Sequence, residues 1–347
     1  MGVNIRSLVP GDVVKTIELR DLADRVVAFD AYNALYQFLA IIRGPDGRPL
    51  MYGGKVTSHL SGLFYRTVNL LEIGIKPVYV FDGEPPALKE AEIKRRMKIR
   101  EEALIKYEEA LKAGRLEEAR KYAQQAAKLK DEMVEEAKKL LTLMGVPWVQ
   151  APSEGEAQAA HLVKRGDADF CASQDYDSLL FGAPALVRNV TISGRRKLPG
   201  KPVYVEVKPE VIRLDELLSA LGITREQLID IAILVGTDYN PKGVKGIGPK
   251  RAYELIKKHG SLEAALRFIK GAEFPVDPSK IKSMFLNPRV TDNYELAWSD
   301  PDEEAIVEFL CEERGFSEDR VRKAINRVLE ARRKAKKKVV KLTEFFG

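Results

Sequence analysis

The chain has few of the residues that build thiol or imidazole sites. Its 347 residues include two cysteines, Cys171 and Cys311, and three histidines, His59, His161 and His259. Two cysteines in unrelated contexts argue against a disulfide framework and a cysteine zinc site, and three scattered histidines argue against an imidazole zinc site. Catalytic chemistry in this chain must therefore rest mainly on other side chains.

Several common segments are also missing. No apolar run is long enough to cross a bilayer, and the N-terminus lacks the basic-then-apolar layout of a signal peptide. A Walker A loop would need Gly-Lys-Ser or Gly-Lys-Thr, which does not occur. A haloacid-dehalogenase-type phosphatase would need an aspartate where Tyr32 stands. We expect a soluble intracellular protein with no membrane partner that belongs to neither enzyme class.

The chain does have enough apolar sequence for a core and a modest excess of positive charge. Hydrophobic residues make up 45%, the formal net charge is +6 and the sequence pI is about 9.0. A chain of this length and apolar share can bury a substantial core. The positive balance is compatible with anionic partners without identifying one.

Three short apolar runs each lead to an aspartate. Residues 26–29 precede Asp30, residues 77–81 precede Asp82, and residues 169–173 lie just before Asp175. Runs without polar alternation are typical of strands buried on both faces of a parallel sheet. Helical patterns lie between them, at residues 57–73 and 153–165. The sequence therefore predicts an α/β fold with a mostly parallel central sheet flanked by helices.

Residues 89–143 have a different character, dense in Lys, Arg, Glu and Ala and without proline. This composition predicts long helices, broken near Gly114. The segment is either a solvated helical hairpin packed on one face or a mobile insertion over an active site. The basic run 94–100, which comes soon after Asp82, fits the second interpretation. Beyond about residue 206 the pattern is mainly helical.

Acidic residues gather where such a sheet would bind a ligand. In an open parallel sheet, ligands lie beyond the carboxyl ends of the strands, which places Asp30, Asp82 and Asp175 at one edge. Further acids are Asp177, Glu154, Glu156 and Asp238. For Glu156 the alternative is a capping box with Ser153, which does not explain Glu154. Asp238 follows an apolar helix end, where the helix dipole disfavours an acid, so it needs another reason.

Acids that converge must have their mutual repulsion offset. Two like charges about 4 Å apart cost roughly 4 kcal/mol at an effective dielectric near 20. Either several carboxyl pKa values rise or cations occupy the site, and all-oxygen ligation suits Mg²⁺ or Mn²⁺. Two such ions can activate a water and stabilise the leaving oxygen of a phosphodiester. The acids therefore predict a divalent-metal-dependent nuclease.

A glycine-rich turn, residues 243–251, lies between two predicted helices. Glycines let backbone amides approach a phosphate, and Lys250 and Arg251 follow at the start of the next helix. Such a turn can hold one phosphodiester strand without reading its sequence. The alternative is an ordinary helix–helix loop, which would also use glycine.

Six motifs, taken in order, make the chain resemble the flap endonuclease family of structure-specific 5′ nucleases in its archaeal form. They are Phe29-Asp30-Ala31, Val80-Phe81-Asp82-Gly83 with Pro85-Pro86, Ala151-Pro152-Ser153-Glu154-Gly155-Glu156-Ala157, Gln174-Asp175-Tyr176-Asp177, Gly236-Thr237-Asp238-Tyr239 and Gly246-Ile247-Gly248-Pro249-Lys250-Arg251. The resemblance covers nearly the whole chain. It implies a PIN-like 5′ nuclease core with a helical arch insertion and a helix–two-turn–helix DNA-binding region.

The same resemblance implies a division of the chain. Residues 1–335 would form a single nuclease domain, with an N-terminal region at 1–100, the arch at about 85–143, and an internal region at about 144–270 that holds the helix–two-turn–helix at 228–260. Residues 336–347 would form a flexible clamp-binding tail.

The resemblance also assigns roles to individual residues. The metal-site acids would be Asp30, Asp82, Glu154, Glu156, Asp175, Asp177 and Asp238. Lys89 and Arg96 would be basic catalytic residues, Arg96 holding the scissile phosphate with two hydrogen bonds and Lys89 supplying a point charge. The DNA-binding residues would be Gly2, Tyr36, Gly246, Gly248, Lys250 and Arg251. Tyr36 would stack on a substrate base; the alternative is a core aromatic.

Cofactors and partners follow from the same resemblance. It implies two Mg²⁺ ions per site, with Mn²⁺ as a substitute, and a K⁺ ion at the helix–two-turn–helix. The partners would be branched DNA with a 5′ flap and a sliding clamp, bound by a monomer. The clamp-binding residues would be Leu342, Phe345 and Phe346, although Val339 stands where a glutamine is usual; the alternative is a frayed basic tail. The location would be the cytoplasm of an archaeal cell, or the nucleus of a eukaryotic one.

These observations lead to one function and two alternatives. The primary hypothesis is a structure-specific 5′ flap endonuclease and 5′–3′ exonuclease that acts near single-strand/double-strand junctions by a two-metal mechanism, in replication, where it would mature Okazaki fragments, and in repair. A related junction or repair nuclease would share the same core. A non-catalytic DNA-binding scaffold recruited to the clamp would not need the complete set of acids.

Overall fold

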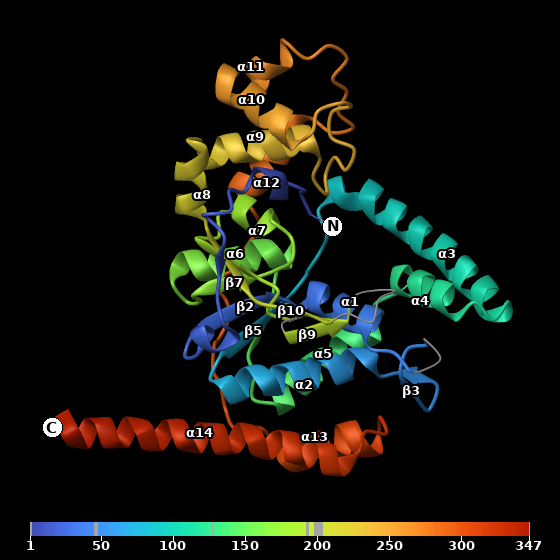
Figure 1. The fold of residues 1–347 in the computed structure, drawn as a ribbon, viewed down its shortest axis with the longest axis vertical. Coiled ribbons are helices and arrows are strands. Elements are labelled where there is room, and N and C mark those ends of the chain that lie inside the picture. Colours follow the sequence, from blue (N-terminus) through green and yellow to red (C-terminus); the bar gives the residue numbers. More distant parts are fainter. Residues whose placement is uncertain (1, 45–47, 127, 192–193, 198–203, 347) are drawn as a thin grey trace.

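The computed structural model describes residues 2–44, 48–126, 128–191, 194–197 and 204–346, and the side chains of all of these except residues 116, 120, 124–125, 195–197, 204–205 and 336–346. Within this part, a central sheet is covered by helices on both faces, and a helical hairpin projects from the body (Figure 1). The predicted α/β class is confirmed.

Among the described residues, the central sheet has seven strands in the order β1-β11-β8-β7-β2-β5-β6. Their bounds are β1 (Lys15–Thr16), β2 (Val26–Asp30), β5 (Lys76–Phe81), β6 (Trp148–Gln150), β7 (Phe170–Ala172), β8 (Ala185–Arg188) and β11 (Glu210–Arg213). The five strands from β8 to β6 run parallel, and at one edge β11 pairs antiparallel with β8 and β1 pairs antiparallel with β11. The sheet is mostly parallel, as predicted, although the sequence pattern does not predict the antiparallel edge.

Strand register brings the carboxyl ends of the parallel strands to one edge. Ala28 of β2 lies opposite Val78 of β5 and Cys171 of β7. Successive side chains point to opposite faces, so these three enter the core on one face, whereas Val27 and Phe29 enter the core on the other. Both faces are buried, which explains why the strands lack polar alternation.

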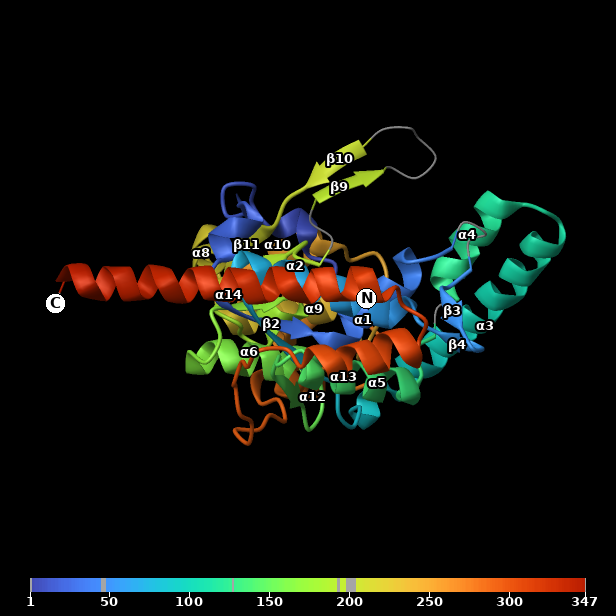
Figure 2. The same cartoon turned by 90° about the horizontal axis from the view of Figure 1, so that it is seen from below.

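Helices cover the two faces in separate groups (Figures 1 and 2). On the Ala28 face lie α6 (Gly155–Arg165), α7 (Asp177–Leu180), α8 (Leu214–Leu221), α9 (Arg225–Val235), α10 (Pro249–His259), α11 (Leu262–Leu266) and α12 (Pro278–Leu286). On the Val27 face lie α1 (Ala31–Ile41), α2 (Ser58–Ile73), α5 (Asp131–Leu143), α13 (Glu303–Val307) and α14 (Glu318–Phe346). The predicted helices near 57–73 and 153–165 correspond to α2 and α6.

The shorter elements lie around this body. They are η1 (Arg6–Leu8), η2 (Leu19–Leu22), the hairpin of β3 (Met51–Tyr52) and β4 (Lys55–Val56), η3 (Ala87–Lys89), the hairpin of β9 (Gly194–Lys197) and β10 (Tyr204–Val207), and the π-helix η4 (Glu308–Glu312). The β9–β10 hairpin stands away from the sheet (Figure 2). Among the described residues, no helix is both long and apolar enough to span a membrane.

The segment predicted as an arch forms three helices. α3 (Glu90–Lys112) and α4 (Leu116–Gln125) make the projecting hairpin, and α5 returns to the body. The predicted break falls at Gly114, whose φ of +69° suits glycine. Small residues let the two helices approach closely: Ala103 and Ala110 of α3 and Ala119 of α4 are buried. The hairpin is therefore packed on one face.

The C-terminal part is helical, as the pattern beyond residue 206 predicts. α14 lies across the base of the molecule against α2 and runs through most of the segment for which a flexible tail was expected (Figure 1). The side chains of Leu342, Phe345 and Phe346 lie outside the described part of the structure. Their clamp-binding role stays a prediction.

Candidate active site

Three predicted acids lie at the carboxyl edge of the sheet. Asp30 ends β2 and also caps α1, because its Oδ1 accepts a hydrogen bond from the amide of Asn33 at 3.0 Å. Asp82 directly follows β5, and its Oδ1 accepts from the amide of Gly155 at 2.6 Å. Asp175 lies three residues beyond β7. The side chains that the strand pattern selects are thus at one edge.

The start of α6 brings Glu154 and Glu156 to this edge. Glycine is required between them, since a Cβ on Gly155 would lie 2.8 Å from Oδ1 of Asp82. The capping-box alternative is wrong: the N-cap is Glu154, and the hydroxyl of Ser153 donates instead to the carbonyl of Glu84. Oε1 of Glu156 accepts from the hydroxyl of Ser173 at 2.5 Å, so this acid faces the sheet edge.

The N-terminal segment reaches into the same site beside Asp177. This aspartate begins α7 and is 5% exposed, and its Oδ1 accepts from the amide of Val3 at 2.7 Å. A Cβ on Gly2 would lie 2.6 Å from that same oxygen. Gly2 therefore lies against Asp177 near the candidate active site, as the resemblance implies, and its DNA-binding role stays a prediction.

A hydrogen-bonded turn after α9 places Asp238. Asn240 is buried, and its Oδ1 accepts from the amide of Thr237 at 3.1 Å and from its hydroxyl at 2.7 Å. Its amide nitrogen donates to the carbonyl of Ile233 at 2.7 Å. Gly236, with φ of +119°, lets the chain leave the helix. The turn folds back on the end of α9 and holds Asp238 toward the arch.

Two cations from the base of the arch meet these acids. The ammonium group of Lys89 pairs with Oε1 of Glu154 and lies 3.3 Å from Oδ2 of Asp238. Arg96 donates to Oδ1 of Asp238 at 2.6 Å and to Oε1 of the buried Glu92 at 2.8 Å. The structure thus brings both predicted basic residues to the acids.

The acids farther from the arch carry an excess of negative charge. Burial, followed by the charge of Asp82, raises the pKa of Asp30 to about 7, and burial, followed by Asp238, raises the pKa of Asp177 to about 7. Burial and the charge of Asp177 raise the pKa of Glu156 well above its usual range. For Asp238 burial acts in the same direction, but Lys89 and Arg96 outweigh it and lower the pKa. Lys89 and Arg96 therefore offset the negative charge near Asp238, whereas the charge near Asp30, Asp177 and Glu156 stays in excess.

The donor set fits a divalent cation, although the side chains are not yet arranged around one. All seven acids offer oxygen ligands, which suit Mg²⁺ or Mn²⁺. As the side chains stand, no group of three or more His, Cys, Asp or Glu residues in the described ranges is close enough to hold an ion. Several of the carboxylates are instead engaged by Lys89, Arg96, the hydroxyl of Ser173 and backbone amides. Cation binding would require some of them to turn.

The remaining predicted DNA-binding residues lie outside this carboxylate cluster. Tyr36 is partly exposed on α1, and the guanidinium of Arg100 stacks on its ring, 4.6 Å from the centroid, so the core-aromatic alternative is wrong. Gly246, Gly248, Lys250 and Arg251 lie on the turn between α9 and α10 and on the first turn of α10. These four residues are exposed to solvent, whereas Tyr36 is half-buried.

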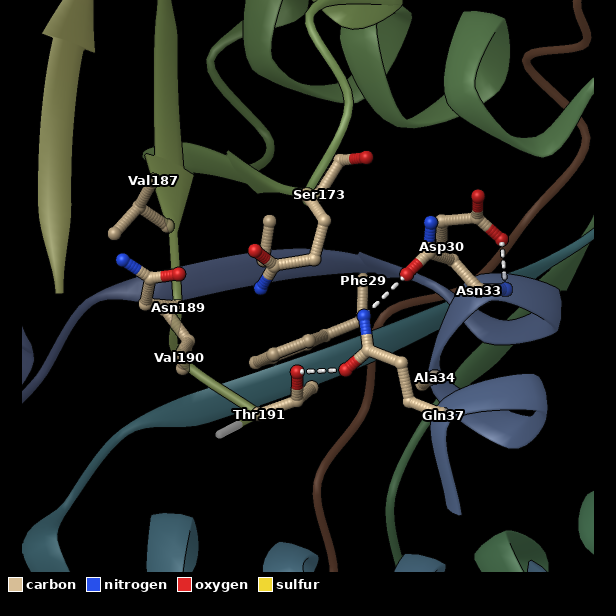
Figure 3. A pocket seen from close by; sticks show the side chains of 12 residues that line it. Phe29, Asp30, Asn33, Ala34, Gln37, Ser173, Val187, Asn189, Val190 and Thr191 are labelled. Atoms are coloured by element: carbon tan, nitrogen blue, oxygen red, sulfur yellow. Dashed lines mark hydrogen bonds between the residues drawn. The ribbon is translucent and has the colours of Figure 1, made fainter. Parts of the chain in front are cut away.

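A small pocket borders Asp30 on the side of α1 (Figure 3). Its free volume of about 10 Å³ holds about one water, so it is too small for a nucleobase. The amide nitrogen of Gln37 donates to Oδ1 of Asn33 at 2.6 Å, and the hydroxyl of Thr191 donates to Oε1 of Gln37 at 2.7 Å. The bond from Thr191 joins α1, which is capped by Asp30 and carries Tyr36, to the segment that follows β8.

Sequence reasoning missed several groups that shape the site. Tyr239 donates its hydroxyl to Glu154, Ser173 donates to Glu156, and Glu92 orients Arg96. Tyr239 adjoins a predicted acid within a recognised motif, which was the one available signal. Ser173 and Glu92 stand out by neither spacing nor residue type.

Comparison with known proteins agrees with this geometry. Residues 1–103 match the family model described as XPG N-terminal domain, and residues 145–238 match the XPG I-region. Flap endonuclease 1 of Staphylothermus marinus is 60% identical over 96% of this chain and 96% of its own length. Flap endonuclease 1 of Pyrococcus abyssi is 58% identical over 95% of each chain.

Solved structures give the same result. Flap endonuclease-1 from Methanococcus jannaschii is 46% identical and superposes with a TM-score of 0.74 over 95% of this chain and 98% of that one. High identity over nearly the full length, the two matched family models and this structural match agree with one another. The chain therefore belongs to the flap endonuclease 1 family of structure-specific nucleases, which serve DNA replication and repair.

Proposed function

We propose that this flap endonuclease hydrolyses DNA phosphodiesters at 5′ flaps in a Mg²⁺-dependent reaction, and that it also acts as a 5′–3′ exonuclease. The observation that carries the proposal is the carboxylate cluster, with Lys89 and Arg96 reaching it from the arch. An acidic pocket alone would repel a phosphate. Cations bound to the acids, together with the two basic side chains, would make the same pocket attractive to it.

The acids would hold two divalent cations: Asp30, Asp82, Glu154, Glu156, Asp175, Asp177 and Asp238. When bound, these ions would lower the pKa of the attacking water and neutralise charge that develops on the phosphodiester. Mn²⁺ has similar ligand preferences and would substitute for Mg²⁺. The raised pKa values of Asp30 and Asp177 support this role, because a buried carboxyl that lacks a counter-charge is a favourable place for a cation.

Lys89 and Arg96 would bind the scissile phosphate. Both now pair with Asp238, and Lys89 also pairs with Glu154. A phosphate in the site offers these cations alternative acceptor oxygens, and Arg96 can present two parallel donors to it. Both side chains start from the base of the arch, so flap binding and arch position would be coupled.

Two other regions would position the DNA. Tyr36 would stack on a base near the junction, which requires Arg100 to leave the ring face that it now covers. The turn at residues 243–251 would hold the backbone of the downstream duplex through exposed amides, Lys250 and Arg251, with a K⁺ ion at its carbonyls. Backbone binding of this kind weakens steeply as salt rises.

Cleavage of a labelled 5′-flap duplex tests the proposal. The native protein should cut near the junction with Mg²⁺ and be inactive with EDTA. Asp177→Ala should lose at least about a thousandfold in rate, equal to ~4 kcal/mol of transition-state stabilisation. An inactive native protein, or unchanged cutting by Asp177→Ala, would refute the proposed chemistry. Faster cutting of four-way junctions than of flaps would favour a junction nuclease.

The clamp-binding tail remains part of the proposal. Leu342, Phe345 and Phe346 would dock on a sliding clamp, with the protein acting as a monomer. Deleting residues 342–347 should lower clamp-stimulated cutting and leave clamp-independent cutting intact. Equal loss of both activities would contradict this division of labour. A cytoplasmic location likewise stays a prediction.

A further inference from the structure

The hydroxyl of Tyr239 is hydrogen-bonded to Glu154 of the carboxylate cluster and has no role in the proposed function. Tyr239 follows Asp238 in the turn after α9 and is 3% exposed. Its hydroxyl donates to Oε2 of Glu154, and its ring packs edge-on against Phe285, with centroids 5.4 Å apart. Because buried Asn240 cross-links the same turn, Tyr239 has little freedom to move.

The two oxygens of Glu154 have different partners. Oε2 accepts from Tyr239, whereas Oε1 faces the ammonium group of Lys89. Oε1 is buried, and no hydrogen-bond donor among the described residues is aligned on it, so the ion pair alone occupies this oxygen. Lys89 also lies over the Tyr239 ring, with Nζ 5.8 Å from the centroid. One phenol thus contacts both the acid and the arch cation.

We propose that Tyr239 is a positioning residue that holds Glu154 in place through Oε2. The other oxygen, Oε1, can then exchange its partner Lys89 for a divalent cation. This inference rests on the metal-dependent function proposed above. A carboxylate with one oxygen tied to a buried donor cannot rotate freely, so its other oxygen is presented in one direction. When a cation replaces Lys89 at Oε1, Lys89 loses an anionic partner and becomes available to the scissile phosphate.

Tyr239→Phe isolates the hydroxyl. A phenylalanine keeps the ring against Phe285 and beneath Lys89 and removes only the donor to Glu154. Tyr79→Phe is the matched control: Tyr79 is also fully buried, and its hydroxyl lies 2.9 Å from that of Thr67 in the core beneath α2. Both changes remove one buried phenol hydrogen bond, but only one of these bonds is made to a candidate cation ligand.

Calorimetric titration of the DNA-free protein with Ca²⁺ provides the main readout. Tyr239→Phe should weaken Ca²⁺ binding about tenfold or more, the usual effect of losing a hydrogen bond to a metal ligand, and Tyr79→Phe should leave it unchanged. In flap cleavage, Tyr239→Phe should need about tenfold more Mg²⁺ for half-maximal rate. Its rate should recover to within about threefold at saturating Mg²⁺.

The possible outcomes separate this inference from the proposed function. Equal Ca²⁺ affinity of the native protein and Tyr239→Phe would overturn the inference, even if flaps are cut. A native protein that binds Ca²⁺ but cuts no flap would refute the proposed function, and the titration of the two variants would still decide the role of Tyr239. A native protein that binds no divalent cation would overturn both. Equal loss of thermal stability in the two variants with unchanged affinity would indicate a structural role only.

Discussion

Two buried ionic clusters in this molecule have opposite electrostatic character. The first is the carboxylate cluster of the active site. The second, the Glu136 cluster, consists of Glu136 on α5, His59 on α2 and Arg314 after η4. His59 Nε2 lies 3.1 Å from Oε2 of Glu136, and Arg314 donates to Oε1 at 2.6 Å and 3.2 Å. All three residues are buried.

The pKa values separate the two clusters. Burial works to raise the pKa of Glu136, but the bonds from His59 and Arg314 outweigh it, and the pKa is lowered. In the carboxylate cluster, burial and neighbouring acids raise the pKa values of Asp30 and Asp177 to about 7. The Glu136 cluster is balanced in charge by Arg314. The carboxylate cluster lacks positive charge and is suited to a ligand that supplies it.

Removing the acid of the Glu136 cluster should have the largest effect, and this effect is on the stability of the fold. Glu136→Ala should lower the free energy of unfolding by ~3–5 kcal/mol, because it removes the buried carboxylate from the buried guanidinium of Arg314 and leaves only the exposed Glu313 to pair with it. Denaturant unfolding measures the change. Flap cutting should persist at a temperature where the variant is folded. A loss below about 1 kcal/mol would mean that the pairing of Glu136 with Arg314 contributes no more than an exposed ion pair.

The pH dependence of stability should have opposite signs in the two clusters. The pKa values of Asp30 and Asp177 rise from 3.8 in the unfolded chain to about 7 in the cation-free fold. Between these pH values the folded protein binds more protons, so these residues make stability fall as pH rises toward 7. The lowered pKa of Glu136 contributes stability that is present above its unfolded value of 4.5 and is lost as pH falls through the lower, folded value.

Chemical unfolding in EDTA at several pH values between 5 and 8 measures this difference. Asp177→Asn should flatten the fall in stability between pH 5 and 7, because it removes one of the carboxyl groups with a raised pKa. Glu136→Gln should leave that part of the curve unchanged in slope. Identical slopes in the native protein and Asp177→Asn would show that Asp177 is not protonated in the cation-free fold.

An exposed ion pair gives the smallest expected effect. Lys94 on α3 pairs with Glu90 at 2.6 Å, and both side chains are well exposed. Lys94→Ala should change stability by less than about 0.5 kcal/mol and leave flap cutting within about twofold, although it lies in the same basic run as Arg96. Thermal unfolding and cleavage rates measure both. A large loss of cutting would mean that the charge of the whole run, rather than Arg96, acts on the phosphate.

Much of the site could be predicted because its acids follow secondary structure. Asp30, Asp82 and Asp175 lie at or shortly beyond the carboxyl ends of buried strands, whose shared edge follows from parallel pairing. The helices of residues 89–143 and their break near Gly114 could be predicted from composition, whereas the arch itself came from the family resemblance. Gly2 and Tyr36 came only from the family resemblance, since neither residue stands out by spacing.

Other features depend on contacts that sequence patterns do not encode. The edge strands β11 and β1 are short, and β11 pairs antiparallel to β8, so neither gives the apolar run of a buried parallel strand. The capping box at Ser153 failed because a carbonyl 69 residues away, that of Glu84, takes its hydroxyl. The bond from Tyr239 to Glu154 likewise joins segments 85 residues apart.

We infer that the carboxylate cluster lacks positive charge until divalent cations bind. Thermal unfolding of the DNA-free protein with and without Mg²⁺ tests this most directly. At a concentration about 100 times the dissociation constant, each bound ion should add ~2.7 kcal/mol of stability to the native protein, and less to Asp177→Asn. An unfolding temperature that Mg²⁺ does not change in the native protein, or raises equally in Asp177→Asn, would contradict the claim.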